Sequence, residues 1–284
     1  MAFGPNPPPI QAHICVKGGD DAIAFYEKAF GGVCAFKQMA EDGKRVLHAN
    51  IEMFGGEVML HDEFPEFGGD VLAPDSRGGP SVAMRINLPR PSRAPWRPAR
   101  PSRARPTTCS GARATVAFAI HSAMSGRSMR PSRGLERAMN ESVQPPVTTY
   151  LTVKGGLDAI ALYRRAFGAE LLTHKMTDDG GRLLHAALGV FGTMIMLSDE
   201  FPEYDSGSKA PTTLGATTFT LHVGLDDPAE VDAAMSRAAA AGCTVTTPAM
   251  DAFWGMRYGR LTDPFGHAWA FGAPLPVTAE GQLA

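Results

Sequence analysis

Three residues near the C-terminus combine side chains that suit the binding of small aromatic or anionic molecules. Trp254 offers a flat stacking surface, and Arg257 and Tyr258 follow it within four residues. An arginine can clamp an anion through two parallel hydrogen bonds, and a tryptophan can stack on a planar ligand. A lid that packs on its own domain is the alternative interpretation. We expect this group to line a ligand-binding site.

Histidines supply the second set of candidate residues. His48 and His185 each precede an alanine at equivalent places, and His222 lies in a β-branched and aromatic run. An imidazole can act as a general base or a metal ligand, so His185 is the candidate catalytic residue. The structural alternative is a strand histidine that hydrogen-bonds to a neighbour. His267 follows an Asp-Pro-Phe-Gly turn, where we expect a structural role.

Adjacent carboxylates occur twice, at Asp62-Glu63 and at Asp199-Glu200. Each pair follows a run that is typical of a strand. Neighbouring residues on a strand point to opposite faces, whereas a catalytic carboxylate pair must face one substrate. We therefore expect neither pair to act as a general acid and base together.

The chain contains an internal repeat with a long and constant offset. Residues 16–31 match residues 153–168, and residues 47–67 match residues 184–204. The similarity continues without a gap and stops at Leu88 of the first copy. A repeat of this length corresponds to a domain rather than to a solenoid unit, so the chain is a tandem duplication.

The segment at which the repeat stops, residues 89–138, is rich in arginine and proline. Residues 90–137 hold eleven arginines and a single acid, Glu136, which gives this segment a charge of +10 and the remainder of the chain −12. A disordered linker has such a composition, and so does a segment that binds nucleic acid by charge alone.

A shifted reading frame accounts for the same composition. Read out of frame, the codons allowed for residues 119–126 permit Asp-Pro-Phe-Gly-His and then, one residue later, Trp, which is the order at residues 263–269. We interpret residues 89–138 as an out-of-frame and disordered translation, and we expect no nucleic-acid binding. Sequencing of the gene across this segment tests the interpretation, and a gene without such a frame would refute it.

The second copy shows two successive series of one strand, one helix and three strands. Alternating β-branched and aromatic residues predict the strands, and the helical spacing of apolar residues, Pro228 in a first turn and the stops at Gly168 and Gly242 predict the helices. The expected strands are 147–153, 170–176, 182–190, 193–197, 217–225, 243–247, 256–263 and 267–271, and the expected helices are 158–167 and 228–241.

The motifs in these series resemble the vicinal-oxygen-chelate superfamily, which groups glyoxalase-like, bleomycin-resistance-like and dioxygenase-like proteins. The VKG-DAIxFY opening, HAxL, MLxDEFPE and FWGxRYGxLxDPFGHxW are similar to its PhnB-like branch. The resemblance implies an α+β fold of tandem domains, built of paired βαβββ modules whose mixed sheets form a cup. Residues 10–88 would be the incomplete first copy, with its N-terminal module only, and residues 147–275 the complete one.

Enzymes of this superfamily hold a divalent metal in the cup, and the resemblance implies four ligand positions in each copy. In the second copy they fall on Thr148, Met196, Thr218 and Ala270, and in the first copy three of them fall on Gln11, Met59 and Ser81. Thioether and methyl groups are poor ligands for such ions. A shift of two residues along the same strand face would bring His13 and His222 to these positions.

Two functions stay open at this point. We expect a protein that binds a small molecule in the cup of residues 147–275 without a metal or other cofactor. The alternative is a divalent-metal-dependent enzyme of the glyoxalase or dioxygenase type, with His185 and His222 as ligands. The expected ligand-binding residues are Trp254, Arg257, Tyr258, His222, Ser198 and Thr148.

The sequence also bears on compartment and partners. The four cysteines show no zinc-binding or redox spacing, so we expect reduced thiols in a cytoplasmic protein. We see no signal peptide and no apolar run that could span a membrane. Without its second module the first copy should expose apolar surface. We therefore expect the two copies to pair with each other, or the chain to form a homodimer.

Overall fold

The computed structural model describes residues 10–67, 71–86, 117–118, 147–177, 179–204 and 208–276. The segment interpreted as out of frame lies, apart from two residues, outside this part of the chain. The strands are β1 (Ile10–Val16), β2 (Val33–Met39), β3 (Val46–Met53), β4 (Gly56–Asp62), β5 (Val82–Ile86), β6 (Ala117–Phe118), β7 (Val147–Val153), β8 (Glu170–Met176), β9 (Leu183–Val190), β10 (Thr193–Asp199), β11 (Phe219–Gly224), β12 (Thr244–Ala252), β13 (Met256–Thr262) and β14 (Ala268–Pro274). The helices are α1 (Gly19–Phe30), α2 (Pro74–Arg77), α4 (Gly156–Phe167), α5 (Pro211–Leu214) and α6 (Pro228–Ala241), with short 3-10 turns at Pro65–Phe67 and Pro202–Tyr204.

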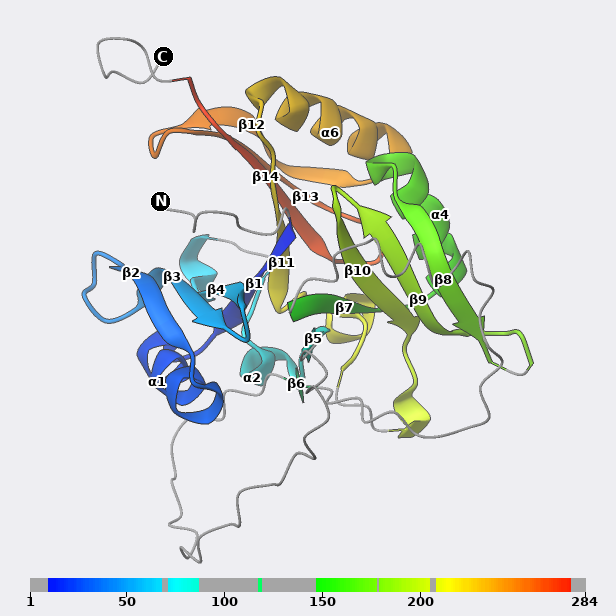
Figure 1. The fold of residues 1–284 in the computed structure, drawn as a ribbon, viewed down its shortest axis with the longest axis horizontal. Helices are drawn as coiled ribbons and strands as arrows, with labels where there is room; N and C mark the ends of the chain where they lie inside the picture. Colours follow the sequence, from blue (N-terminus) through cyan, green and yellow to red (C-terminus); the bar gives the residue numbers. More distant parts are fainter. Residues whose placement is uncertain are drawn as a thin grey trace, which may run out of the picture.

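These strands form two mixed sheets (Figure 1). The larger one has eight strands in the order β12-β13-β14-β11-β1-β4-β3-β2, and the smaller one has six in the order β6-β5-β7-β10-β9-β8. The eight-stranded sheet therefore joins the first module of the first copy to the second module of the second copy. The six-stranded sheet joins the first module of the second copy to β5 and β6.

Residues 147–275 do not close a sheet of their own, and the expectation of a cup within them is corrected. Strand β11 pairs antiparallel with β1, with Thr220 opposite His13, while β7 pairs antiparallel with β5, with Tyr150 opposite Ala83. The backbone groups along the edge of a module's first strand need hydrogen-bond partners. An edge from the other copy satisfies them as well as an edge from the same copy does.

The largest hydrophobic cluster of the described residues contains side chains from both sheets. It contains Ile14 and Leu60 from the first copy and Leu151, Leu221 and Trp269 from the second. Helices α4 and α6 pack against each other above the junction of the sheets (Figure 1). The two sheets are therefore parts of one folded unit.

Helix α6 begins and ends where the sequence predicts. Asp227 precedes it, and its side chain accepts a hydrogen bond of 2.8 Å from the backbone N–H of Ala229. Pro228 occupies the first turn, where no N–H is needed. Gly242 follows the last turn with φ of 111°, a backbone conformation that glycine adopts without steric cost.

The Asp-Pro-Phe-Gly-His turn ties α4 to the end of the eight-stranded sheet. One oxygen of Asp263 accepts from the backbone N–H groups of Phe265 and His267, at 2.9 and 3.0 Å. Its other oxygen accepts from the hydroxyl of Tyr163 at 2.8 Å and from the indole N–H of Trp269 at 3.0 Å. Buried carboxylates are stable only when hydrogen-bonded in this way, so the motif is structural.

His267 has the structural role that we expected. Its side chain is fully buried, and its Nε2 lies 3.0 Å from the carbonyl oxygen of Thr152, on β7 of the other sheet. A carbonyl oxygen only accepts, so Nε2 carries the proton and donates. His267 therefore links the two sheets.

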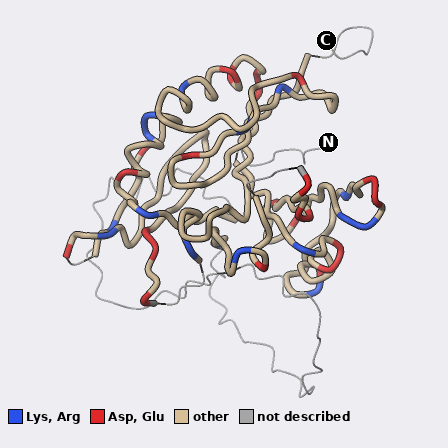
Figure 2. The backbone as a smooth tube through the Cα atoms, turned by 180° about the vertical axis from the view of Figure 1, so that it is seen from behind, with Lys and Arg blue, Asp and Glu red and all other residues tan. Residues whose placement is uncertain are grey.

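Charged residues of the described segments lie mainly on helices and on loops between strands, and long stretches of the strands carry none (Figure 2). Among these segments, no helix has the length and apolar character required to span a membrane.

The pairing of β1 with β11 can be tested by crosslinking. Gln11 lies directly opposite His222, and paired antiparallel residues are about 5 Å apart at Cα, within reach of a disulfide. We expect the Gln11→Cys/His222→Cys double variant to form an intramolecular crosslink with an oxidant or a short bifunctional thiol reagent, detected by peptide mass spectrometry. Each single variant is the control for the native cysteines. A crosslinked dimer, or no crosslink in a folded double variant, would contradict the shared sheet.

Candidate functional site

One face of the eight-stranded sheet is polar although much of it is buried. We call it the polar face and define it by Gln11, His13, His48, Asn50, Glu57, His61, Thr220, His222, Tyr258 and Arg260. The alternate residues of these strands, such as Ile14, Leu60 and Leu221, belong to the hydrophobic core. Strand alternation therefore separates a core side from a side with hydrogen-bonding and titratable groups.

The strand register aligns part of the polar face in a row across the sheet. Gln11 lies opposite His222, His222 opposite Ala270, and Ala270 opposite Arg260. At the far end of the row, the amide of Gln11 donates a hydrogen bond to Glu57. The small side chain of Ala270 separates the imidazole of His222 from the guanidinium of Arg260. The row thus runs from a carboxylate on β4 to a guanidinium on β13.

Four histidines from four strands converge on the polar face. The ring of His13 lies edge-on to the rings of His61 and His48, with centroids 4.6 and 5.0 Å apart. His222, on β11, lowers the pKa of His13, and His48 in turn lowers the pKa of His222. His13 and His48 come from the first copy and His222 from the second, so neither copy assembles this cluster alone.

Hydrogen bonds fix the orientation of two of these rings. The Nδ1 of His61 lies 2.7 Å from the carbonyl oxygen of Asp62, so Nδ1 donates and the lone pair of a neutral ring sits on Nε2. The Nε2 of His48 lies 2.5 Å from the side-chain oxygen of Asn50 and donates to it. The Nε2 of His13 is buried and makes no hydrogen bond within the described part of the chain. His13 therefore directs a polar atom into the cluster without a protein partner for it.

The cluster is held in the neutral form. Burial lowers the pKa of His61 and of His222 to about 4. Burial also lowers the pKa of His13 well below its usual value, and the neighbouring His61 and His48 add to this shift. The pKa of His48 is lowered by burial and partly restored by its hydrogen bond to Asn50. At neutral pH the positive charge of the polar face therefore comes from Arg260.

Aromatic residues connect the polar face to an exposed hairpin. Tyr258 stacks on His222 with centroids 6.2 Å apart, and Trp254 lies edge-on to Tyr258 at 5.6 Å. Phe253, next to Trp254, is 91 % exposed at the turn between β12 and β13. The structure thus brings together three of the residues that the sequence singled out, Trp254, Tyr258 and His222.

Arg257 lies on the other side of β13, and its expected place beside Tyr258 in one binding group is corrected. Its guanidinium pairs with Asp232 of α6 at 2.8 Å and with Asp251 of β12 at 3.0 Å. Consecutive strand residues point to opposite faces, so Arg257 and Tyr258 cannot both line the polar face. Arg260, which the sequence analysis did not single out, shares the face of Tyr258.

The other expected site residues lie in the six-stranded sheet. The hydroxyl of Tyr150 lies 3.1 Å from the Nδ1 of His185 and also bonds to Ser198. Thr148 is buried, lies two residues before Tyr150 on β7 and pairs with Arg85 of β5. His185 and His222 are thus in different sheets, and the structure does not bring them together as a shared ligand pair.

The residues at the four expected metal positions do not fit a divalent ion in the shared sheet. These positions are Gln11 in β1, Met59 in β4, Thr218 directly before β11 and Ala270 in β14. A thioether and a methyl group cannot replace the imidazole and carboxylate ligands that such ions require. In the segments that the structure describes, no three His, Cys, Asp or Glu side chains are arranged to hold a metal. We derive no chemistry through a metal.

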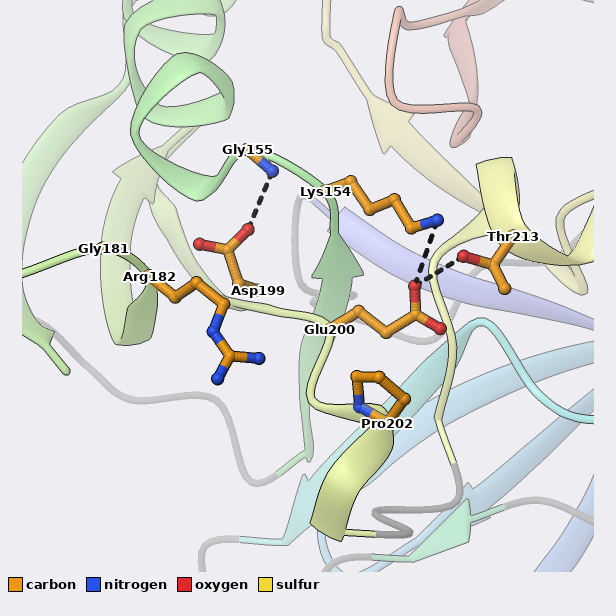
Figure 3. A pocket seen from close by; sticks show the side chains of 8 residues that line it. All are labelled: Lys154, Gly155, Gly181, Arg182, Asp199, Glu200, Pro202 and Thr213. Atoms are coloured by element: carbon orange, nitrogen blue, oxygen red, sulfur yellow. Dashed lines mark hydrogen bonds and ion pairs between the residues drawn. The ribbon is translucent and has the colours of Figure 1, made fainter.

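A pocket of about 390 Å³ lies near the end of β10, away from the polar face (Figure 3). It is lined by Lys154, Gly155, Gly181, Arg182, Asp199, Glu200, Pro202 and Thr213. Asp199 accepts hydrogen bonds from the backbone N–H groups of Gly155, Gly156 and Leu183, at 2.7 to 2.9 Å. Glu200 accepts from Thr213, and Lys154 approaches it at 3.9 Å.

The same contacts recur in the first copy and show what the repeated Asp-Glu pair does. Asp62 accepts from the backbone N–H groups of Gly18, Gly19 and Val46, and Glu63 accepts from Ser76. In both copies the aspartate holds the start of a helix and the glutamate holds a short helix. The carboxylates are thus engaged in structural contacts, as expected for residues that do not form a catalytic pair.

Sequence reasoning missed His61 and Arg260 and considered His13 only as an alternative. The search for ligands stayed within one copy, and these residues converge only when strands of both copies pair. The alternation of side chains along a strand could have identified Arg260, because Arg260 is two residues from Tyr258 on β13 and so lies on the same face.

The low pKa values of the cluster predict a dependence of stability on pH. The imidazoles of His61 and His222 have folded-state pKa values of about 4, below the unfolded value of about 6.5. The unfolded chain therefore binds more protons between these values, and stability falls as the pH decreases through this range. Between pH 7 and pH 5 we expect the free energy of unfolding of the His222→Gln variant to fall by about 2 kcal/mol less than that of the wild type.

Urea unfolding at the two pH values measures this difference. The control is His174, an exposed histidine on β8. The His174→Gln variant should lose as much stability between pH 7 and pH 5 as the wild type does. If His222→Gln and the wild type lost equal amounts of stability between pH 7 and pH 5, His222 would not be held in the neutral form.

Comparisons with known proteins agree with this architecture. The glyoxalase/bleomycin resistance protein/dioxygenase superfamily matches residues 146–271. An uncharacterized protein of Mycobacterium bovis is 42% identical over 135 residues, which cover 47% of this chain and 86% of that protein. An uncharacterized protein of Mycobacterium tuberculosis is also 42% identical over 135 residues, which cover 77% of its length.

One solved structure supports the fold over most of the chain. A mutant of glyoxalase I from Zea mays is 14% identical and aligns over 93% of this chain and 92% of its own, with a TM-score of 0.52. A PhnB protein from Bacillus cereus, described as a putative 3-demethylubiquinone-9 3-methyltransferase, covers 44% of this chain at 20% identity and a TM-score of 0.35. The predicted α+β fold of paired modules is confirmed. This chain belongs to the glyoxalase/bleomycin resistance protein/dioxygenase superfamily.

Proposed function

We propose that the protein binds a small organic molecule on the polar face of the eight-stranded sheet, without a metal at the positions that the superfamily uses. One observation carries the proposal: ten polar or titratable side chains from both copies converge on a face that is largely withdrawn from water. Burial of polar groups is costly unless they gain partners. A bound ligand would supply such partners, for instance to the buried Nε2 of His13.

The protonation of the histidines favours binding over acid–base catalysis. A general base works best when its pKa lies near the working pH. Burial places the pKa of His61 and His222 at about 4, so these imidazoles are weak bases at neutral pH. As neutral groups they still accept or donate hydrogen bonds. The polar face is therefore suited to hold a ligand and less suited to abstract protons from it.

The rings of Trp254, Tyr258 and His222, which we call the aromatic line, offer the ligand a contact surface that begins at the exposed hairpin. Trp254 is 36 % exposed, and Tyr258 beyond it stacks on His222. A planar molecule that replaces water on these rings would gain both apolar burial and stacking. In the six-stranded sheet, Tyr150 and Leu172 pack against the buried Met194 and Met196.

Fluorescence titration with the uncharged probe N-phenylnaphthylamine tests the proposal on the full chain. We expect saturable binding of one probe per chain. Binding should be at least fivefold weaker in Tyr258→Ala, because stacking between two aromatic rings contributes about 1 kcal/mol. Tyr150→Ala, which removes the equivalent ring type from the other sheet, is the matched control and should bind the probe as the wild type does. Addition of EDTA should leave the affinity unchanged.

Two results would refute the proposal. Weaker binding in Tyr150→Ala but not in Tyr258→Ala would place the site in the six-stranded sheet. Loss of binding in EDTA would make the protein metal-dependent. Thermal unfolding of both variants confirms that each is folded before its affinity is compared.

A further inference from the structure

We infer that the ligand of the polar face is a planar aromatic monoanion, with its charge beside Arg260 and its ring against Tyr258 and Trp254. The class includes aromatic carboxylates, sulfonates and phenolates. This inference rests on the proposed function, because it assigns the ligand chemistry of the same face.

Arg260 supplies the positive end of the polar face. It stands two residues from Tyr258 on β13, so both side chains leave the strand on the same side. Its charge lowers the pKa of His13 and of His61, which shows that the guanidinium lies close to both imidazoles. Arg260 is also partly withdrawn from water, where its field is screened less than at an open surface.

The other titratable groups of the polar face include one carboxylate, which lies at the end opposite to Arg260. They are His48 on β3, His61 and Glu57 on β4, His222 on β11 and Tyr258 on β13. The imidazoles are neutral at pH 7, and Glu57 lies at the opposite end of the row, where it accepts hydrogen bonds from Gln11 and Asn50. An anion would therefore be attracted to the β13 side of the face, and a cation would be repelled from it.

Neutral histidines beside an arginine suit an anion in a second way. The Nε2 of His13 can carry a proton and donate it in a hydrogen bond. A guanidinium with neighbouring N–H donors holds a carboxylate or sulfonate through charge-assisted hydrogen bonds. On β14 the residues opposite Arg260 and Tyr258 are Ala270 and Gly272, and the side chains of Met256 and His222 approach Gly272.

The aromatic line determines the shape of the remainder of the ligand. Tyr258 and His222 are nearly parallel, with an interplanar angle of 24°, and Trp254 closes the edge of Tyr258. Flat rings are the groups that stack on such surfaces. Because Tyr258 and Arg260 leave β13 on the same side, the ring and the charged group should belong to one small ligand.

A pair of probes that differ in one charged group tests the inference. Anilinonaphthalene sulfonate carries the ring system of N-phenylnaphthylamine and adds one sulfonate. We expect the full chain to bind the sulfonate at least tenfold more tightly than the uncharged probe at low ionic strength. Arg260→Met should remove most of this preference and change the affinity for the uncharged probe less than twofold. Arg257→Met, on the opposite face of the same strand, removes an equal charge and should keep the preference.

The outcomes separate this inference from the proposed function. Equal affinities of the wild type for both probes, or the same loss in Arg257→Met as in Arg260→Met, would overturn the anionic ligand while the binding face stands. Binding of neither probe at the polar face would overturn both. A preference for the sulfonate that depends on Arg260 and on Tyr258 would support both.

Discussion

The antiparallel pairing of β1 with β11 is the interaction on which the polar face depends. Its register sets Ala12 opposite Leu221 on the core side and Gln11 opposite His222 on the polar side. Because side chains alternate along a strand, a slip of one residue would exchange the two sides and bury the imidazoles in the hydrophobic core. The cost of burying polar groups without partners excludes that register. The pairing therefore determines both the core and the chemistry of the face.

The same pairing determines how the two copies share the fold. A module with a free first-strand edge needs another module, and each copy supplies the edge that the other one uses. Within the described residues, the first module of the second copy pairs with β5 and β6 instead. The two sheets are consequently unequal, with eight and six strands. Only the eight-stranded sheet combines two full modules within the described residues.

Local patterns in the sequence predicted the elements well but could not determine their partners. Helix α6 has the predicted start and stop, and strand β7 has the predicted bounds, because caps, glycines and alternation are encoded locally. The choice between β11 and β5 as the neighbour of β7 depends on contacts far apart in the chain, and an alternating strand fits either edge. The expectation of a sheet closed within residues 147–275 was wrong for this reason. The placement of Arg257 beside Tyr258 was an error of a different kind, since strand parity alone excludes it.

A comparison of the two copies separates the residues that build the fold from those that give each face its chemistry. The structural carboxylates recur as Asp62 and Asp199, with the same backbone contacts. The polar face does not recur, because His13 and His61 are replaced by Tyr150 and Ser198 in the second copy. After a duplication, contacts that hold a helix start in place stay necessary in both copies, whereas a second face is free to change its ligand. The histidine cluster is therefore a specialisation of the shared eight-stranded sheet, and the six-stranded sheet presents tyrosine and serine at the same positions.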